Sequence, residues 1–95
     1  MTRALIRFDA ENIVSFDLLA LLKLCEFNDF HEQSALAALR HHGEFRDVDG
    51  VTTVTTEGAL AMCIAAQSAG RPAALRQLKR TLMLLGDDIE EEGWQ

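Results

Sequence analysis

Two consecutive helices predicted between residues 56 and 85 carry more apolar side chains than a small domain needs for one core. The first, residues 56–69, has apolar residues around nearly its whole circumference: Ala59, Leu60, Ala61, Met62, Cys63, Ile64, Ala65 and Ala66. The second, residues 72–85, carries four leucines at spacings of three, four and three: Leu75, Leu78, Leu82 and Leu85. A helix that is apolar on every side must be enclosed, by its own chain or by a partner.

The leucine row of the second helix has two interpretations. It either packs into the core of its own chain or, together with Met62, forms the seam of a dimer. A domain of this size buries only about 60–65% of the surface that its unfolded chain exposes, so the rest of the chain offers little cover. We therefore expect a homodimer held by an isologous contact.

Acidic residues are concentrated at the C-terminus. The net charge is −6 over 95 residues, and five carboxylates near the end supply five of those six charges: Asp87, Asp88, Glu90, Glu91 and Glu92. The chain before residue 87 is therefore close to −1. We expect a single domain over residues 1–86, followed by an acidic tail over residues 87–95. This charge balance argues against a dominant phosphate-binding surface.

Strand signals occur in two places. Residues 3–8 predict a first strand, and Ile13-Val14 is a candidate for a short second one. Asp49-Gly50 is a strong hairpin signal that joins predicted strands over residues 44–48 and 51–55. We expect an α+β fold, in which the N-terminal strand and the 44–55 hairpin form a small antiparallel sheet packed on four helices.

Two further helices precede the hairpin. Ser15 is a suitable N-cap for a helix over residues 16–25. Asp29 and Glu32 resemble a capping box at the start of a helix that runs to about residue 42 and buries Phe30, Ala35, Leu36 and Leu39.

Glycine, proline and threonine residues are expected to start, cap or end the remaining helices. Gly43 is expected to stop the helix that precedes the hairpin, and Thr55 or Thr56 to cap the helix that follows it. Gly70 then ends the 56–69 helix, and Pro72 takes the first position of the next.

The sequence carries no catalytic or metal-binding signature. Cys25 and Cys63 lie on apolar helical faces, as buried reduced thiols do, which favours a cytoplasmic protein. His41 and His42 are adjacent, so they point about 100° apart on a helix and cannot act together as metal ligands on one face. There is no Gly-rich phosphate loop and no apolar run of about 18 residues that would span a membrane. We expect no enzymatic activity, no cofactor, no metal and no membrane partner.

Nucleic-acid binding is a serious alternative. The helix pair over residues 16–25 and 30–42, followed by a hairpin, has the order of a winged helix-turn-helix module. DNA contacts would come from the second helix, the hairpin and the basic face of the last helix: Gln33, Arg40, Arg46, Arg76, Lys79 and Arg80. Asp47 and Asp49, close to the hairpin turn, oppose such contacts because they would face phosphate.

Part of the chain resembles the Bro-N and related phage antirepressor domains. The similar stretches are Thr52-Thr53-Val54-Thr55-Thr56-Glu57-Gly58-Ala59-Leu60 with Ser68, Pro72 and Lys79-Arg80 downstream, and Ile13-Val14-Ser15-Phe16 with the leucines of residues 18–24 upstream. In that family a strand ends in a Thr-Glu turn, and a helix of small residues, a Ser–Pro break and a basic amphipathic helix follow. The chain departs from the pattern at Glu57-Gly58, which lacks an intervening residue. The resemblance implies a small regulatory protein of phage or prophage origin that binds a repressor or DNA.

These observations favour a non-enzymatic regulator that acts by protein–protein contact, as an antirepressor does. Its acidic surface, with the carboxylates of residues 87–92 as the main candidate, would occlude or sequester a basic DNA-binding or host protein. The alternatives are a winged helix-turn-helix transcriptional regulator and an inhibitor of a host enzyme or defence complex.

Overall fold

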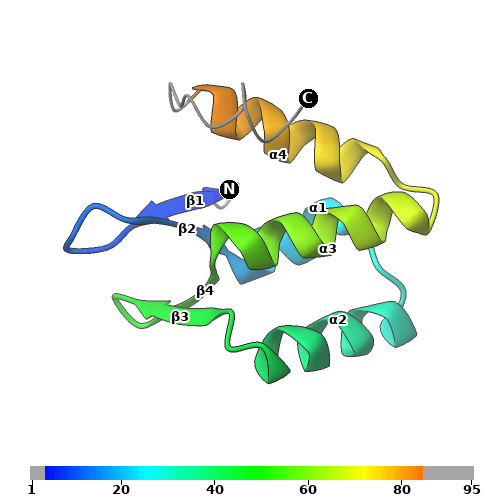
Figure 1. Cartoon of the computed structure of the whole chain (residues 1–95), viewed down its shortest axis with the longest axis horizontal. Helices are drawn as coiled ribbons and strands as arrows, with labels where there is room; N and C mark the ends of the chain where they lie inside the picture. Colours follow the sequence, from blue (N-terminus) through cyan, green and yellow to red (C-terminus); the bar gives the residue numbers. More distant parts are fainter. Residues whose placement is uncertain (1–3, 85–95) are drawn as a thin grey trace.

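The chain folds into four helices and a four-stranded sheet, as seen in a computed structural model that describes residues 4–84 (Figure 1). In chain order the elements are β1 Ile6–Phe8, β2 Val14–Asp17, α1 Leu18–Cys25, α2 Asp29–His41, β3 Phe45–Val48, β4 Val51–Val54, α3 Thr56–Ser68 and α4 Ala73–Leu84. The expected α+β class is confirmed. The predicted tail over residues 87–95 lies outside the described part of the chain.

The sheet is antiparallel throughout and has the strand order β1-β2-β4-β3. The N-terminal strand therefore reaches the hairpin through β2, whose Phe16 pairs with Ile6 on one side and with Val54 on the other. This corrects the predicted helix over residues 16–25, because Ser15 and Phe16 belong to β2 and the helix begins at Leu18. Phe16 is fully buried in that position, so tertiary packing extends the strand beyond the two residues expected.

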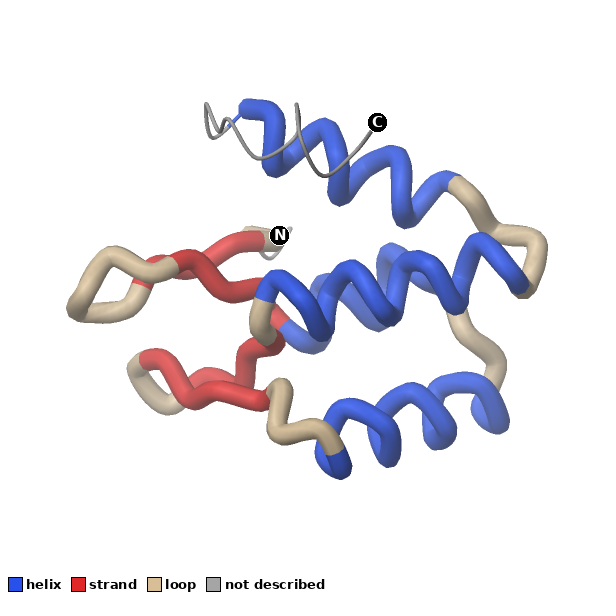
Figure 2. The backbone as a smooth tube through the Cα atoms, in the orientation of Figure 1, coloured by secondary structure: helices blue, strands red, loops and turns tan. Residues whose placement is uncertain are grey.

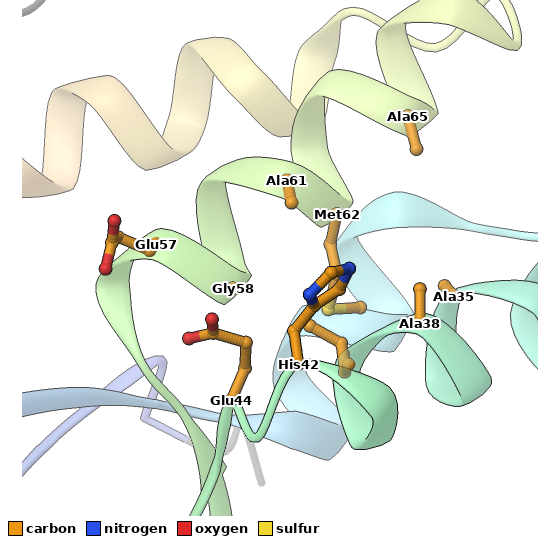
Figure 3. Close-up of a pocket in the computed structure, with 10 residues that line it drawn as sticks. Ala35, Ala38, His42, Glu44, Glu57, Gly58, Ala61, Met62 and Ala65 are labelled. Atoms are coloured by element: carbon orange, nitrogen blue, oxygen red, sulfur yellow. The ribbon is translucent and has the colours of Figure 1, made fainter.

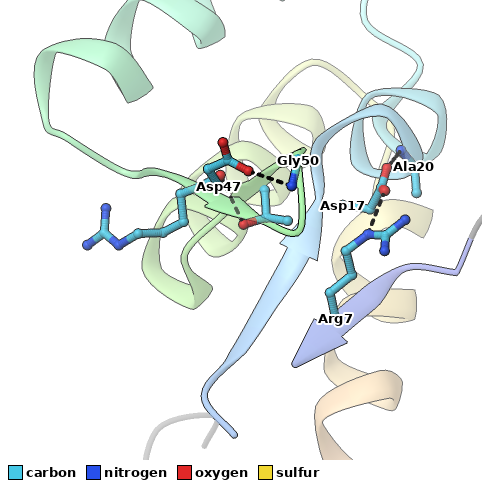
Figure 4. A network of polar contacts seen from close by, with 7 residues as sticks. Arg7, Asp17, Ala20, Asp47 and Gly50 are labelled. Atoms are coloured by element: carbon cyan, nitrogen blue, oxygen red, sulfur yellow. Dashed lines mark hydrogen bonds and ion pairs between the residues drawn. The ribbon is translucent and has the colours of Figure 1, made fainter. Parts of the chain in front are cut away.

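Asp17, and not Ser15, caps α1. Its carboxylate accepts a hydrogen bond from the Ala20 N–H at 3.0 Å and pairs with the Arg7 guanidinium at 3.2 Å (Figure 4). The first contact satisfies an N–H group at the helix start, and the second ties β1 to the start of α1. Asp17 is fully buried, so the Arg7 partner offsets part of the cost of placing a carboxylate there.

The expected hairpin forms, with β3 and β4 shorter by one residue each at their outer ends. Asp49 and Gly50 both have positive φ, +53° and +81°, which is the conformation of a type I′ turn. The Asp47 carboxylate accepts the Gly50 N–H at 3.0 Å and fixes the turn from outside (Figure 4).

Helix ends follow the predicted chemistry with small shifts. Asn28 caps α2 by accepting the His31 N–H at 2.8 Å, so the expected cap at Asp29 was wrong by one residue. Thr55 caps α3, and Gly70, at φ +90°, ends it: the Arg71 N–H donates to the Ala66 carbonyl and the Gly70 N–H to the Gln67 carbonyl. Helix α4 begins just after Pro72, one residue later than predicted.

Helix α3 is the centre of the molecule. It lies between α4 and α2, with α1 behind it, and both hairpins extend from one end of the helical layer (Figures 1 and 2). Its buried residues join Phe16, Leu21 and the leucine row of α4 in one core. None of the helices within residues 4–84 is long and apolar enough to cross a membrane.

The leucine row of α4 packs inside its own chain. Leu75, Leu78 and Leu82 are at most 8% exposed, and Met62 of α3 is 2% exposed. This arrangement supports the interpretation of the leucine row as ordinary core packing, because a single chain already buries these side chains. Leu85, the fourth member of the row, lies outside the described residues.

Candidate functional site

An apolar groove separates α2 from α3 (Figure 3). Its narrow part has a volume of about 170 Å³ and its wide part about 520 Å³, and the two parts share Ala35, Ala38 and Ala65. The other lining residues are Leu39, His42, Glu44, Glu57, Gly58, Ala61 and Met62 in the narrow part, and Phe27, His31, Ser34, Ser68 and Ala69 in the wide part. One apolar side of α3 is therefore covered only in part by α2.

Gly58 sets the narrow end of the groove. A Cβ atom at this position would lie 2.5 Å from Val54 Cγ1, 2.9 Å from Glu44 Cβ and 3.1 Å from Leu39 Cδ2. Only glycine lets the first turn of α3 approach the end of α2 and the start of β3 so closely.

Hydrogen bonds hold this end together. The Glu44 N–H donates to the Leu39 carbonyl, and the Thr55 N–H donates to the Glu44 carbonyl, each at 3.0 Å. The Thr55 hydroxyl also donates to the Glu44 carboxylate. The spacing of α2 and α3 is thus fixed where both helices meet the hairpin.

Short side chains keep the rest of the groove open. Ala35 and Ala38 on α2 face Ala61 and Ala65 on α3, and a methyl group on each wall does not fill the space between two helices. Leu39 is the one residue of α2 that is fully buried. The apolar pattern does not locate this site, because it requires cover for α3 from its own chain or from a partner without saying where, and because it predicts a buried Phe30. Phe30 is in fact 74% exposed.

The polar and acidic side chains that line the groove lie at its two ends. Glu57, which is exposed, and Glu44, which is half-buried, line the narrow end together with His42. His31 lines the wide end, where its buried Nδ1 has no hydrogen-bond partner among residues 4–84. Among the residues that the structure describes, alanine, leucine and methionine side chains line the middle of the groove.

The predicted DNA-contact residues do not come together in the fold. Gln33 and Arg40 are exposed on α2, whereas Arg76, Arg80 and the half-buried Lys79 belong to α4, which lies on the other side of α3 (Figure 1). The Arg46 guanidinium donates to the carbonyls of Gly43 and Phe45, both at 2.8 Å. The predicted acidic surface, Asp87, Asp88, Glu90, Glu91 and Glu92, lies outside the described residues.

Cys25 and Cys63 are both fully buried, and neither forms a disulfide. The hydrogen bond between their side chains, together with burial, raises the pKa of the Cys63 thiol. A buried thiol held in its neutral form is inert as a nucleophile or metal ligand. Within residues 4–84, no three His, Cys, Asp or Glu side chains are grouped closely enough to hold a metal ion.

No family model matches the chain, and neither a curated protein nor a solved structure matches it.

Proposed function

We propose that this chain is a small non-enzymatic regulator that binds another protein in the groove between α2 and α3. The observation that carries the proposal is this groove, an apolar surface of α3 that α2 covers only in part. Apolar grooves with a few polar groups at their ends are typical binding sites for peptides and protein segments.

The charge of the chain favours a basic partner. Glu44 and Glu57 lie at one end of the groove, and the chain as a whole carries −6. DNA-binding proteins present basic surfaces, so the chain would act as an antirepressor by occluding or sequestering such a protein. The carboxylates of residues 87–92 would add attraction that depends on ionic strength. The buried reduced cysteines support a cytoplasmic site of action.

A displacement experiment tests this function. The full chain is used to capture proteins from the organism that encodes it, and each captured protein is purified and bound to its own DNA. We expect the chain to release the DNA at stoichiometric concentration, and a chain truncated after residue 86 to do so more weakly at low salt. If no captured protein loses its DNA, the occlusion mechanism is wrong.

Direct DNA binding is the second candidate, because β2, α1, α2, β3 and β4 follow one another as in a winged helix. The sheet order β2-β4-β3 and the helix pair between β2 and β3 favour this candidate. Gln33 and Arg40, on the exposed face of α2, would contact bases in the major groove of DNA. Asp47 and Asp49 at the hairpin would weaken binding because they repel phosphate. Binding of duplex DNA at stated salt, lost in Arg40→Ala and kept in Gln67→Ala, would support this candidate.

Self-association stays a separate proposal, with different residues in the contact. Met83 and Leu84, at the end of α4, are 56% and 81% exposed, whereas the leucine row is covered. A concentration-dependent dimer seen by sedimentation should therefore be lost in Leu84→Lys.

Inhibition of a host enzyme or defence complex is the remaining alternative. It would use the groove between α2 and α3 and the same acidic residues.

A further inference from the structure

We infer that the groove between α2 and α3 takes an amphipathic α-helix of the partner, with a Lys or Arg at the end that lies beside Glu44 and Glu57. This inference rests on the proposed function, because it names the kind of segment that the same groove binds. It follows from the hydrogen-bonding capacity, length, side-chain size and charge of the groove walls.

Hydrogen-bonding capacity favours a helix over an extended segment. Both walls are helices, whose backbone N–H and C=O groups already pair within each helix. Within the described part of the chain, the middle of the groove is lined by residues that provide no side-chain donors or acceptors: Ala35, Ala38, Ala61, Ala65, Leu39 and Met62. An extended peptide would bury unpaired amides there, and each buried amide without a hydrogen-bond partner weakens binding. A helix satisfies its own backbone and loses nothing.

The dimensions of the groove agree with this occupant. On α3 the lining residues run from Glu57 to Ala69, which corresponds to about 18 Å, or about three turns of helix. Alanine walls let a third helix approach closely, so the occupant would present small or medium apolar residues at i, i+3, i+4 and i+7.

Two exposed apolar residues extend the contact beyond the walls. Ile64 is 50% exposed and does not line the groove itself, but it lies three residues after Ala61 and four before Ser68, at the margin of the groove side of α3. Phe30 is 74% exposed and precedes the groove residue Ser34 by four positions on α2. Both would cover the flanks of a helix seated between α2 and α3.

The charges give the occupant a direction. Glu57 and Glu44 lie at the narrow end, and among residues 4–84 no carboxylate lines the wide end. A Lys or Arg at one end of the partner helix would meet the two glutamates, and its apolar residues would follow toward Phe27.

Two peptide libraries of equal length, about 16 residues each, test the inference with the full chain as bait. One library is helix-forming, with variable residues on a single face, and the other is extended by interspersed prolines. Affinities of the enriched peptides are then measured by fluorescence anisotropy. Ala65→Arg and Ala38→Arg place a charge on opposite walls, and Gln67→Arg is the matched control at an exposed position of α3 that does not line the groove. Circular dichroism confirms that each variant folds.

We expect enrichment from the helix-forming library, with Lys or Arg at one end of the selected peptides. Either groove variant should weaken binding by about tenfold or more, and Gln67→Arg should leave it within about twofold. Glu57→Gln should weaken binding about two- to fivefold at low salt and not at high salt, whereas Glu26→Gln should have no effect.

Three results would overturn the inference: enrichment of extended peptides, no enrichment from either library, or equal affinity for wild type and both groove variants. None of these decides the proposed function. A natural partner that still loses its DNA to the Ala65→Arg chain would preserve the proposed function and place its contact elsewhere. A chain that selects helices but displaces no protein from DNA would preserve the groove and reject the regulatory role.

Discussion

The contact at Gly58 makes a quantitative prediction about stability. In Gly58→Ala the new Cβ would lie 2.5 Å from Val54 Cγ1, about 1 Å inside the ordinary contact distance between carbon atoms. Val54 is fully buried, and the second contact is with Glu44 Cβ, next to the backbone, so neither atom can move away freely. Overpacking of this kind costs about 1–3 kcal/mol.

Helix propensity acts in the opposite direction. Alanine is better than glycine inside a helix by about 1 kcal/mol, and by less in the first turn, where Gly58 lies. We therefore expect a net loss of about 1–2 kcal/mol in the free energy of unfolding. Each kcal/mol lowers the melting temperature of a domain this size by about 4–8 °C. Urea unfolding followed by circular dichroism measures the difference between the two chains.

A control in the same helix separates the two effects. Ala61→Gly removes a methyl group that faces the open groove, so it should cost only the propensity difference of about 1 kcal/mol. In a double-mutant cycle, Val54→Ala should reduce the cost of Gly58→Ala, because it removes the nearest clashing atom. Stabilisation by Gly58→Ala, or no coupling to Val54, would refute the close-contact argument.

Three further predictions follow from the fold. Asp17→Ala removes the α1 cap and the carboxylate that pairs with Arg7, so it should lower the free energy of unfolding by about 2–4 kcal/mol in urea titrations. Arg7→Ala should lower it less, because Arg7 is partly exposed. Gly50→Ala should cost about 1–2 kcal/mol in the same assay, because φ of +81° is strained for any residue with a Cβ; an unchanged midpoint would exclude the type I′ turn. The raised pKa of Cys63 means that folding favours the neutral thiol. The contribution of this thiol to the free energy of unfolding is fully present below the unfolded pKa of about 8.5 and is lost as pH rises above it. The melting temperature should therefore fall above that pH in wild type, and fall less in Cys63→Ala. Rapid labelling of the native chain by a thiol reagent at neutral pH would contradict the burial of the two cysteines.

The sequence predicted local structure well where one residue type allows a single conformation. Asp49-Gly50 specified the hairpin, Gly43 and Gly70 ended helices, and Thr55 capped α3. At the start of α1 the local signals conflicted, since Ser15 and Asp17 are both good caps. Pairing of Phe16 with two neighbouring strands, which is a tertiary effect, decided in favour of Asp17.

The groove was not predictable from periodicity, because an alanine fits a core and an open wall equally well. Its width depends on the approach of Gly58 to Leu39 and Glu44, residues from separate parts of the chain. The sequence did indicate that α3 has too much apolar surface. The structure shows that α1, α4 and the sheet enclose most of this surface, that part of the remainder lines the groove beside α2, and that Ile64 is half exposed outside the groove.

Arg46 protects one of the two edge strands of the sheet, β3, against pairing with another chain. Strand β3 has a neighbour on one side only, and such edges invite strand addition by another chain. The Glu44 carbonyl pairs with Thr55, so the next carbonyl along the chain, that of Phe45, points away from the sheet. The Arg46 guanidinium donates a hydrogen bond to the Phe45 carbonyl and another to the Gly43 carbonyl. An incoming strand would have to displace a charged side chain to make its first hydrogen bond, so Arg46→Ala should raise the rate of fibril formation while leaving the melting temperature nearly unchanged.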